Sequence, residues 1–347
     1  MFTHIMTGES WISFPNLLPN TGLKFNIDST AFTIGSFEVK WYGIMLCLGI
    51  LACLILGMTT CKKYDIKQDD VLDYVLFALP SAIVGARLYY VIFNFSLYKN
   101  DLSSIFDVRS GGLAIYGGII GAVIALICVS LYKKHKFLKI IDFGIIFIPL
   151  GQAIGRWGNF FNQEAYGSVT KMPWGMTGSV IEKEVVAAGY DAGSLVHPTF
   201  LYESLWCFAL FAFLFVYSRK WKKSHGECLA LYMIFYGIER AIVEGLRTDS
   251  LYIGNTDIRV SQLLSVVLVI FGITFFIDSR RRYKKEQLDQ ATEEETSSGL
   301  ASVIERYDAA LSEDKAGAEE AEFMANQSDE IQAYDDLNVT DEDSKQS

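Results

Sequence analysis

Histidine is scarce in this sequence, and its scarcity argues against a metalloprotein. Only four of the 347 residues are histidine, and they lie far apart in the chain, at His4, His135, His197 and His225. The six cysteines include no C-x-x-C pair, so we interpret them as small apolar packing residues. We therefore expect neither a metal ion nor another cofactor.

Two further patterns are missing. The apolar segments lack a serine–histidine or paired-aspartate arrangement, which argues against an intramembrane protease. The first 36 residues contain no basic cluster before an apolar core, so they do not resemble a cleaved signal peptide. We expect residues 1–36 to form an outward N-terminal arm, in which Phe14, Pro15, Leu17 and Leu18 lie at the membrane interface.

Long apolar segments are abundant. Hydrophobic residues make up 51% of the chain, and seven stretches approach the roughly 20 residues that a helix needs to cross a bilayer. The sequence predicts an all-α, polytopic membrane protein whose seven-span domain covers residues 37–285. The expected spans are Phe37–Thr60, Val71–Phe95, Gly111–Tyr132, Ile140–Asn159, Thr199–Tyr217, Gly226–Gly245 and Ile258–Ile277.

Charge is segregated along the chain. Residues 286–347 carry 19 acidic and 3 basic residues, whereas the remaining 285 residues have a net charge of +6. This acidity, with few aromatic residues, predicts a disordered cytoplasmic tail that is dispensable for activity.

Lysine and arginine in the connections predict the orientation. One side of the predicted membrane domain holds 16 of them and the other side holds 8, so we expect the N-terminus outside and the C-terminus in the cytoplasm. The basic side comprises Lys62, Lys63, Lys67, Lys133, Lys134, Lys136, Lys139, Arg219, Lys220, Lys222, Lys223, Arg280, Arg281, Arg282, Lys284 and Lys285. The other side comprises Lys24, Lys40, Lys99, Arg109, Lys171, Lys183, Arg247 and Arg259.

Polar residues within the spans converge on the outer leaflet. A charge at membrane depth is costly and marks a functional site by default. Three arginines lie in the outward parts of their spans, and three further polar residues open spans on the same side: Arg87, Arg156 and Arg240, with Tyr42, Tyr116 and His197. A transporter or channel would instead distribute polar residues along its depth or carry a pair of broken helices at the midplane.

The sixth predicted span carries a polar stripe. Tyr236, Arg240, Glu244 and Arg247 are spaced by four, four and three residues, which places them on one helical face. A simple Arg240–Glu244 pair would neutralise two buried charges without any function. The additional arginines favour an anionic ligand, because the guanidinium fork matches phosphate oxygens.

Six motifs carry a resemblance to a known family. The segment GRWGNFFNQEAYG (Gly155–Gly167) resembles the signature of the bacterial prolipoprotein diacylglyceryl transferases. Five further motifs match in the order of the family: KWYGIM (Lys40–Met45), GARLYYV (Gly85–Val91), SGGLAIYGG (Ser110–Gly118), HPTFLYE (His197–Glu203) and YGIERAIVEGLR (Tyr236–Arg247).

The resemblance implies an activity and its partners. Members of the family transfer the diacylglyceryl group of phosphatidylglycerol to the lipobox cysteine of exported prolipoproteins, which forms a thioether and releases glycerol phosphate. It implies phosphatidylglycerol, a prolipoprotein signal peptide and the lipid bilayer as partners, with no nucleic acid. The expected location is the bacterial cytoplasmic (inner) membrane, with the site facing the outer leaflet.

The resemblance also assigns roles to residues. Arg156 and Arg240 would hold the phosphate, and Asn159 and Glu164 would hold the headgroup glycerol or orient the arginines. The expected catalytic group also contains Tyr116, and the expected substrate-binding group comprises Arg156, Tyr42, Arg87, Gly167, His197, Tyr236, Glu244 and Arg247.

The general base stays open. Members of the family commonly have histidine at the position of Tyr116, and a tyrosine, with an ordinary pKa of about 10, is a poor base at neutral pH. Tyr116 would then only orient lipid or peptide. His197 is either a site residue or a cap at the entrance of a span. The loop from Phe160 to Val196 either covers the cavity or meets the lipobox, or it is a plain connector.

Overall fold

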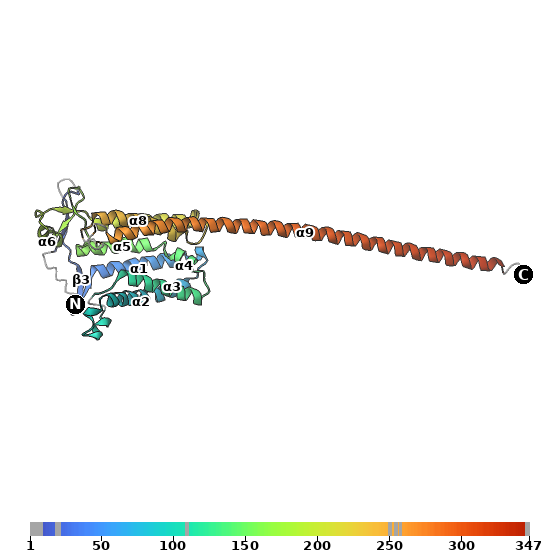
Figure 1. Ribbon diagram of the computed structural model, residues 1–347, viewed down its shortest axis with the longest axis horizontal. Helices are drawn as coiled ribbons and strands as arrows, with labels where there is room; N and C mark the ends of the chain where they lie inside the picture. Colours follow the sequence, from blue (N-terminus) through green and yellow to red (C-terminus); the bar gives the residue numbers. More distant parts are fainter. Residues whose placement is uncertain are drawn as a thin grey trace. The chain divides into compact units, whose positions relative to one another are not determined.

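The structure is a computed structural model that describes residues 10–17, 22–107, 111–248, 252, 256 and 259–343. Leu18, Arg109, Ser110 and Ile258, which enter the predictions above, lie outside the described residues. The chain divides into two compact units, Met1–Arg281 and Arg282–Ser347. Within the first unit, helices α1, α2, α3 and α5 lie side by side, and the strands and helix α6 gather at one end (Figure 1).

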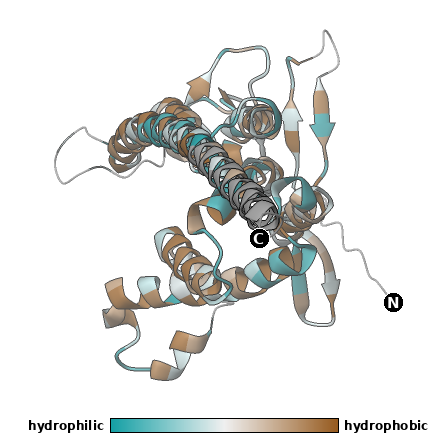
Figure 2. Cartoon of the chain, turned by 90° about the vertical axis from the view of Figure 1, so that its right-hand side faces the viewer, coloured by the Kyte–Doolittle hydropathy of each residue, from teal (hydrophilic) through white to brown (hydrophobic). Residues whose placement is uncertain are grey.

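The fold is mainly helical, as the sequence predicts. Among the described residues, five helices are long and apolar enough to cross a membrane by themselves. They are α1 (Trp41–Thr60), α2 (Gln68–Phe93), α3 (Ile115–Tyr132), α7 (Thr199–Lys220) and the apolar first part of α9 (Val260–Asp343). These helices are rich in apolar residues (Figure 2), and many of their large apolar side chains are exposed, as expected for a surface that faces lipid. The chain is therefore a polytopic membrane protein.

The fourth predicted span is broken. Helix α4 (Phe137–Gly144) and helix α5 (Ile148–Asn162) meet at a bend of 41°, and together they qualify as a sixth span. Pro149 at the start of α5 explains the break, because proline has no N–H to donate to the preceding turn and restricts the residue before it.

Helix α8 (Glu227–Leu246) coincides with the sixth predicted span, and it packs against α7. It carries the charged residues Glu239, Arg240 and Glu244 in its second half, and it is not among the five helices above. Each predicted span thus coincides with a helix, and the number seven stays a prediction.

The prediction of helix from Phe37 is wrong. Strand β4 (Phe37–Lys40) pairs with β3 (Thr30–Ile34) as an antiparallel hairpin, and α1 begins only at Trp41. Alternating apolar residues of FEVK suit a strand, and Gly35 supplies the positive φ of the turn, +62°.

Short strands and one helix form a cap at the end of the bundle where α5 and α8 finish. The N-terminal strand β1 (Ile12–Phe14) lies between β2 (Leu23–Phe25) and β6 (Thr177–Gly178). A second pair joins β5 (Val169–Thr170) to β7 (Leu195–Val196), and α6 covers Ser179–Ala187.

The cap has its own apolar core. Ile12 and Phe14 from the N-terminal arm pack with Phe160 and Phe200, which belong to α5 and α7, and with Met176 of the long loop. The loop from Phe160 to Val196 is therefore an ordered, packed element and not a plain connector. Ile12 and Phe14 of the N-terminal arm belong to the same core. Phe14 therefore packs against protein, whereas the sequence analysis placed it at the membrane interface.

Helices α2 and α3 approach each other through glycines. A Cβ on Gly85 would lie 2.4 Å from the carbonyl oxygen of Gly117, and a Cβ on Gly121 would lie 2.2 Å from that of Ser81. Small residues at helix contacts let the backbones come close, which is a main source of helix association in lipid. On the α1–α5 contact, Gly49 faces Gly151 in the same way.

The acidic segment differs from its prediction. The chain is helical from Arg282 to Asp343, where the sequence predicted disorder. Residues 286–347 contain no proline and are rich in alanine and glutamate, which favour helix even without tertiary contacts. Every side chain that the structure describes from Lys284 onward is exposed, so local propensity rather than packing accounts for this helix.

We expect Gly121→Val to lower the yield and melting temperature of the detergent-solubilised protein, because the valine side chain would clash with the backbone of α2. Gly43→Val is the matched control, since a Cβ at Gly43 meets nothing within 4 Å. Size-exclusion profiles and thermal melts of both variants provide the measurement. Equal behaviour of the two variants would contradict this account of the α2–α3 contact.

Candidate active site

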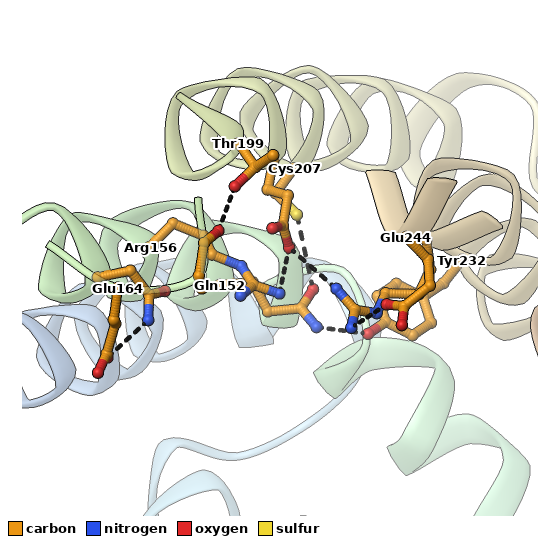
Figure 3. Close-up of polar contacts among 11 residues, drawn as sticks. Gln152, Arg156, Glu164, Thr199, Cys207, Tyr232 and Glu244 are labelled. Carbon is orange, nitrogen blue, oxygen red and sulfur yellow. Dashed lines mark hydrogen bonds and ion pairs between the residues drawn. The ribbon is translucent and has the colours of Figure 1, made fainter. Parts of the chain in front are cut away.

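A buried carboxylate joins two arginines at the centre of the candidate site. Glu203 of α7 is 1% exposed, and its Oε2 forms ion pairs with Arg156 of α5 and with Nη1 of Arg240 on α8, the latter at 3.6 Å. Arg240 Nη2 also lies 2.8 Å from Oε2 of Glu244, one turn further along α8. The four side chains form one chain of ion pairs across three helices (Figure 3).

Helix direction explains why these residues meet. Helices α5 and α8 finish at the end of the bundle where α7 begins, because each successive span reverses direction. Arg156 and Arg240 lie in the second halves of their helices, whereas Glu203 lies in the first turns of α7. The three side chains therefore reach one level, just beneath the cap.

The arginines keep donors available for a ligand. Their side chains are 23% and 20% exposed, for Arg156 and Arg240, whereas the carboxylates of Glu203 and Glu244 are almost fully buried. Each guanidinium has five N–H donors, and the carboxylates engage only some of them. The two guanidinium groups can thus offer preorganised, charged N–H donors to an anion such as phosphate.

A neutral polar layer lies one turn deeper. Gln152, four residues before Arg156, donates from Nε2 to the Tyr232 hydroxyl at 2.9 Å, and Cys207 Sγ lies 4.0 Å from Gln152 Oε1. The Tyr232 ring stacks on Tyr236 with centroids 5.3 Å apart. Figure 3 shows Gln152, Cys207 and Tyr232 together between α5, α7 and α8. Tyr236 lies within electrostatic reach of both arginines.

The chain turns sharply where α5 ends. Glu164 Oε1 accepts hydrogen bonds from Asn159 Nδ2 at 2.9 Å and from Asn162 Nδ2 at 3.2 Å. Gln163 and Ala165 both have φ of +55°, which is uncommon for residues other than glycine. Such strained positions persist only where their surroundings hold them, and they cluster at functional sites.

Gln163 is held by the cap, and the sequence analysis did not anticipate it. Its side chain is 2% exposed. Nε2 donates to the hydroxyls of Ser10 and Ser179, both at 3.3 Å, and Oε1 accepts from the backbone N–H of Val180 at 2.9 Å. This residue therefore fastens the signature segment to the N-terminal arm and to α6.

Gly167 ends the signature at a point of close packing. Its N–H donates to the His197 carbonyl at 2.9 Å, and it forms a β-bridge with Arg247 at the end of α8. A Cβ on Gly167 would lie 2.8 Å from Cβ of His197 and 3.1 Å from the carbonyl oxygen of Leu246. The need for glycine here is steric, and the site residues from α5, α7 and α8 are joined at this point.

His197 belongs to a small hydrogen-bonded chain outside the spanning segments. Its Nδ1 lies 3.1 Å from the Tyr202 hydroxyl, which also accepts from Trp174 Nε1 at 2.7 Å. Partial burial lowers the pKa of His197 below its ordinary value, so the imidazole is neutral at pH 7. The neutral ring and its polar partners lie at the entrance of α7.

Tyr42 lies against the signature helix. A Cβ on Gly158 would lie 2.5 Å from Cδ2 of Tyr42, so the ring packs flush on the α5 backbone. Tyr42 is 42% exposed, which leaves much of the ring available to other molecules.

Arg87 has a different environment from the other arginines. It is 6% exposed, and its guanidinium donates to the carbonyl oxygens of Ser104, Ile105, Gly111 and Gly112 at 2.6–3.1 Å. These bonds fasten the loop that leads into α3.

Tyr116 lies in the first turn of α3, just beyond that loop. It is 46% exposed, and its hydroxyl has no hydrogen bond within the part of the chain that the structure describes. Among the described residues, no hydrogen bond or ion pair joins Arg87 or Tyr116 to the arginine–glutamate chain, although Arg87 holds the loop before Tyr116.

The predicted residues thus fall into three groups. The ion-pair chain contains Arg156, Arg240 and Glu244, with Tyr236 beside it. The turn after α5 contains Asn159, Glu164, Gly167, His197 and Arg247, and the periphery contains Tyr42, Arg87 and Tyr116. Sequence reasoning missed Glu203, although it ends the HPTFLYE motif, because its two partners are distant in sequence.

The fold and the site define a polytopic membrane protein with two arginines that are bridged by a buried glutamate. The chain belongs to the prolipoprotein diacylglyceryl transferase family, which matches residues 29–278. It is 46% identical over 260 residues to a phosphatidylglycerol–prolipoprotein diacylglyceryl transferase of Finegoldia magna, covering 75% of this chain and 97% of that protein. The proteins of the same name from Clostridioides difficile and Clostridium kluyveri are 42% and 44% identical, covering 71% and 75% of this chain and 93% and 99% of theirs.

We expect Gly167→Ala to destabilise the protein by about 1–3 kcal/mol, the usual cost of overpacking a tight contact. Gly155→Ala in the same signature is the control, because a Cβ there meets nothing within 4 Å. Thermal melts in detergent measure both variants. If Gly167→Ala and Gly155→Ala have equal melting temperatures, His197 can move to accommodate the added methyl group without a loss of stability.

Proposed function

We propose that this chain transfers the diacylglyceryl group of phosphatidylglycerol to the lipobox cysteine thiol of prolipoproteins. The products are a thioether-linked diacylglyceryl cysteine and glycerol phosphate, in the first step of lipoprotein maturation. Membership of the family and the names of its relatives support this reaction.

The observation that carries the proposal is the bridge of Glu203 between Arg156 and Arg240. The glycerol phosphate that leaves gains negative charge as the carbon–oxygen bond breaks. Preorganised cations at that point stabilise the transition state more than the ground state. Glu203 holds the two guanidinium groups in place before substrate arrives, so little reorganisation is needed during the reaction.

The neighbouring residues take supporting roles in this proposal. Asn159 and Glu164, joined at 2.9 Å, hold the headgroup glycerol or orient the arginines. Tyr42, Tyr236 and Glu244 line the lipid site. Gly167, His197 and Arg247 shape the entrance beneath the cap, where the peptide arrives.

The site faces the outer leaflet of the bacterial cytoplasmic membrane in this proposal. The excess of lysine and arginine in the connections at the opposite end supports that orientation. The lipobox cysteine of an exported precursor emerges on the outer side, where it meets the lipid headgroup. The acidic segment from residue 286 would then lie in the cytoplasm, away from the reaction.

Purified protein, phosphatidylglycerol and a lipobox peptide provide the test. Release of glycerol phosphate should coincide with a diacylglyceryl mass increase on the peptide cysteine. We expect Arg156→Ala to lower the rate at least about 100-fold, as loss of one transition-state donor does elsewhere. The exposed Arg281→Ala is the matched control and should retain the rate of the original protein.

If well-folded protein releases no glycerol phosphate, the proposed activity is wrong. Release without peptide would indicate hydrolysis of the headgroup by a phospholipase. Full activity of Arg156→Ala would show that Arg156 is not needed for the reaction.

Tyr116→Phe tests whether the phenol takes part in proton transfer. We expect a loss of tenfold or less, because a hydroxyl that only orients substrate contributes about 0.5–1.5 kcal/mol. Steady-state rates with phosphatidylglycerol and peptide measure the effect. A loss beyond about 100-fold, the scale of general-base catalysis, would instead make Tyr116 the base.

A further inference from the structure

Glu239 is a buried carboxyl group close to the two arginines. It precedes Arg240 on α8 and is 2% exposed. Neither of its carboxyl oxygens has a hydrogen-bond partner among the described residues. The neighbouring Glu203 and Glu244 differ, because each forms an ion pair with an arginine.

Glu239 lies near the arginines but does not contact them. Successive residues of a helix are separated by a rise of about 1.5 Å and a rotation of about 100°. Glu239 therefore lies at nearly the same height along α8 as Arg240 but points to an adjacent side of the helix. It lies close enough to Glu203, Arg156 and Arg240 to interact with them electrostatically. The same holds for the thiol of Cys207. Tyr232 and Tyr236 precede it by seven and three residues, on its own side of α8.

Packing does not explain a carboxyl group at this position. Burying a polar group without a hydrogen bond costs free energy, and a buried unpaired charge costs more. A group with two free oxygens at this level therefore points to a ligand or a proton that completes it. Arg156 and Arg240 remain 23% and 20% exposed, whereas Glu239 is buried.

The proposed reaction needs a group of this kind. A thiol is only a few per cent ionised at neutral pH, so a base that takes its proton speeds attack. The attacked glycerol carbon is bonded directly to a phosphate oxygen. In a displacement the sulfur approaches the carbon from the side opposite that oxygen. The base must therefore lie beside the sulfur, a few ångströms from the arginines that hold the phosphate and not in contact with them.

We propose that Glu239 is the base that accepts the proton of the lipobox thiol. This inference rests on the proposed transferase activity. The S–H bond breaks as its proton passes to the Glu239 carboxylate, and the sulfur lone pair forms the S–C bond. The C–O bond to phosphate breaks, and its electron pair leaves on glycerol phosphate beside Arg156 and Arg240. Glu239 then returns its proton to the departing phosphate.

The test compares two peptides on one variant. Glu239→Gln keeps the size of the side chain and removes the base. With a cysteine lipobox peptide, we expect kcat to fall about 100-fold or more, within the range of general-base catalysis. With a selenocysteine peptide, whose selenol is already ionised at neutral pH, kcat should stay within a few-fold of the original protein. A purely structural role would lower both rates alike.

Controls separate this inference from the proposed function. Arg156→Ala should lose activity with both peptides, because it acts on the leaving group. If the original protein releases no glycerol phosphate with either peptide, the transferase proposal fails. If the original protein is active and Glu239→Gln keeps its full rate with the cysteine peptide, or loses both rates equally, only the base assignment fails.

A second variant keeps the test decisive if Glu239→Gln does not fold. Glu239→Asp retains a carboxylate but withdraws it by one methylene group. We expect it to slow the cysteine peptide more than the selenocysteine peptide. Equal effects on the two peptides would overturn the assignment.

Discussion

The candidate site depends on one buried carboxylate. Glu203 is 1% exposed and forms ion pairs with Arg156 and Arg240, which come from different helices. Removing one partner of a buried ion pair is strongly destabilising, because the other charge is left uncompensated. Glu203 therefore sets the separation of the two guanidinium groups, and it fixes the level at which α5, α7 and α8 meet.

The cap serves the same centre from the other side. Gln163 fastens the turn after α5 to Ser10 and to α6, and Gly167 joins that turn to the start of α7 and the end of α8. The backbone at Gln163 and Ala165 is held in the left-handed region by these contacts. The segment that carries the family signature is thus constrained at both ends, by ion pairs below and by the cap above.

Local periodicity was enough to predict much of this arrangement. Apolar segments of about 20 residues located the helices. The four-residue spacing of Arg240 and Glu244 placed them on one helical face, and in the structure the two side chains form an ion pair. The gathering of polar residues at the ends of α5 and α8 correctly indicated the level of the arginines.

Long-range contacts could not be predicted in this way. Glu203 was missed because its two partners lie 47 and 37 positions away, on other helices. The cap was missed because two-residue strands such as β6 have no periodicity of their own and form by pairing with β1, far away in the sequence. The sequence shows only that Arg87 lies within a span, and the structure shows that its guanidinium donates hydrogen bonds to backbone carbonyl oxygens.

The central claim is that Arg156 and Arg240 together hold the phosphate of phosphatidylglycerol. The most direct measurement is an experimental structure of the protein with phosphatidylglycerol bound in a lipid environment. The account predicts phosphate oxygens within hydrogen-bonding distance of both guanidinium groups, with Glu203 still between them. A phosphate bound away from both arginines would contradict it.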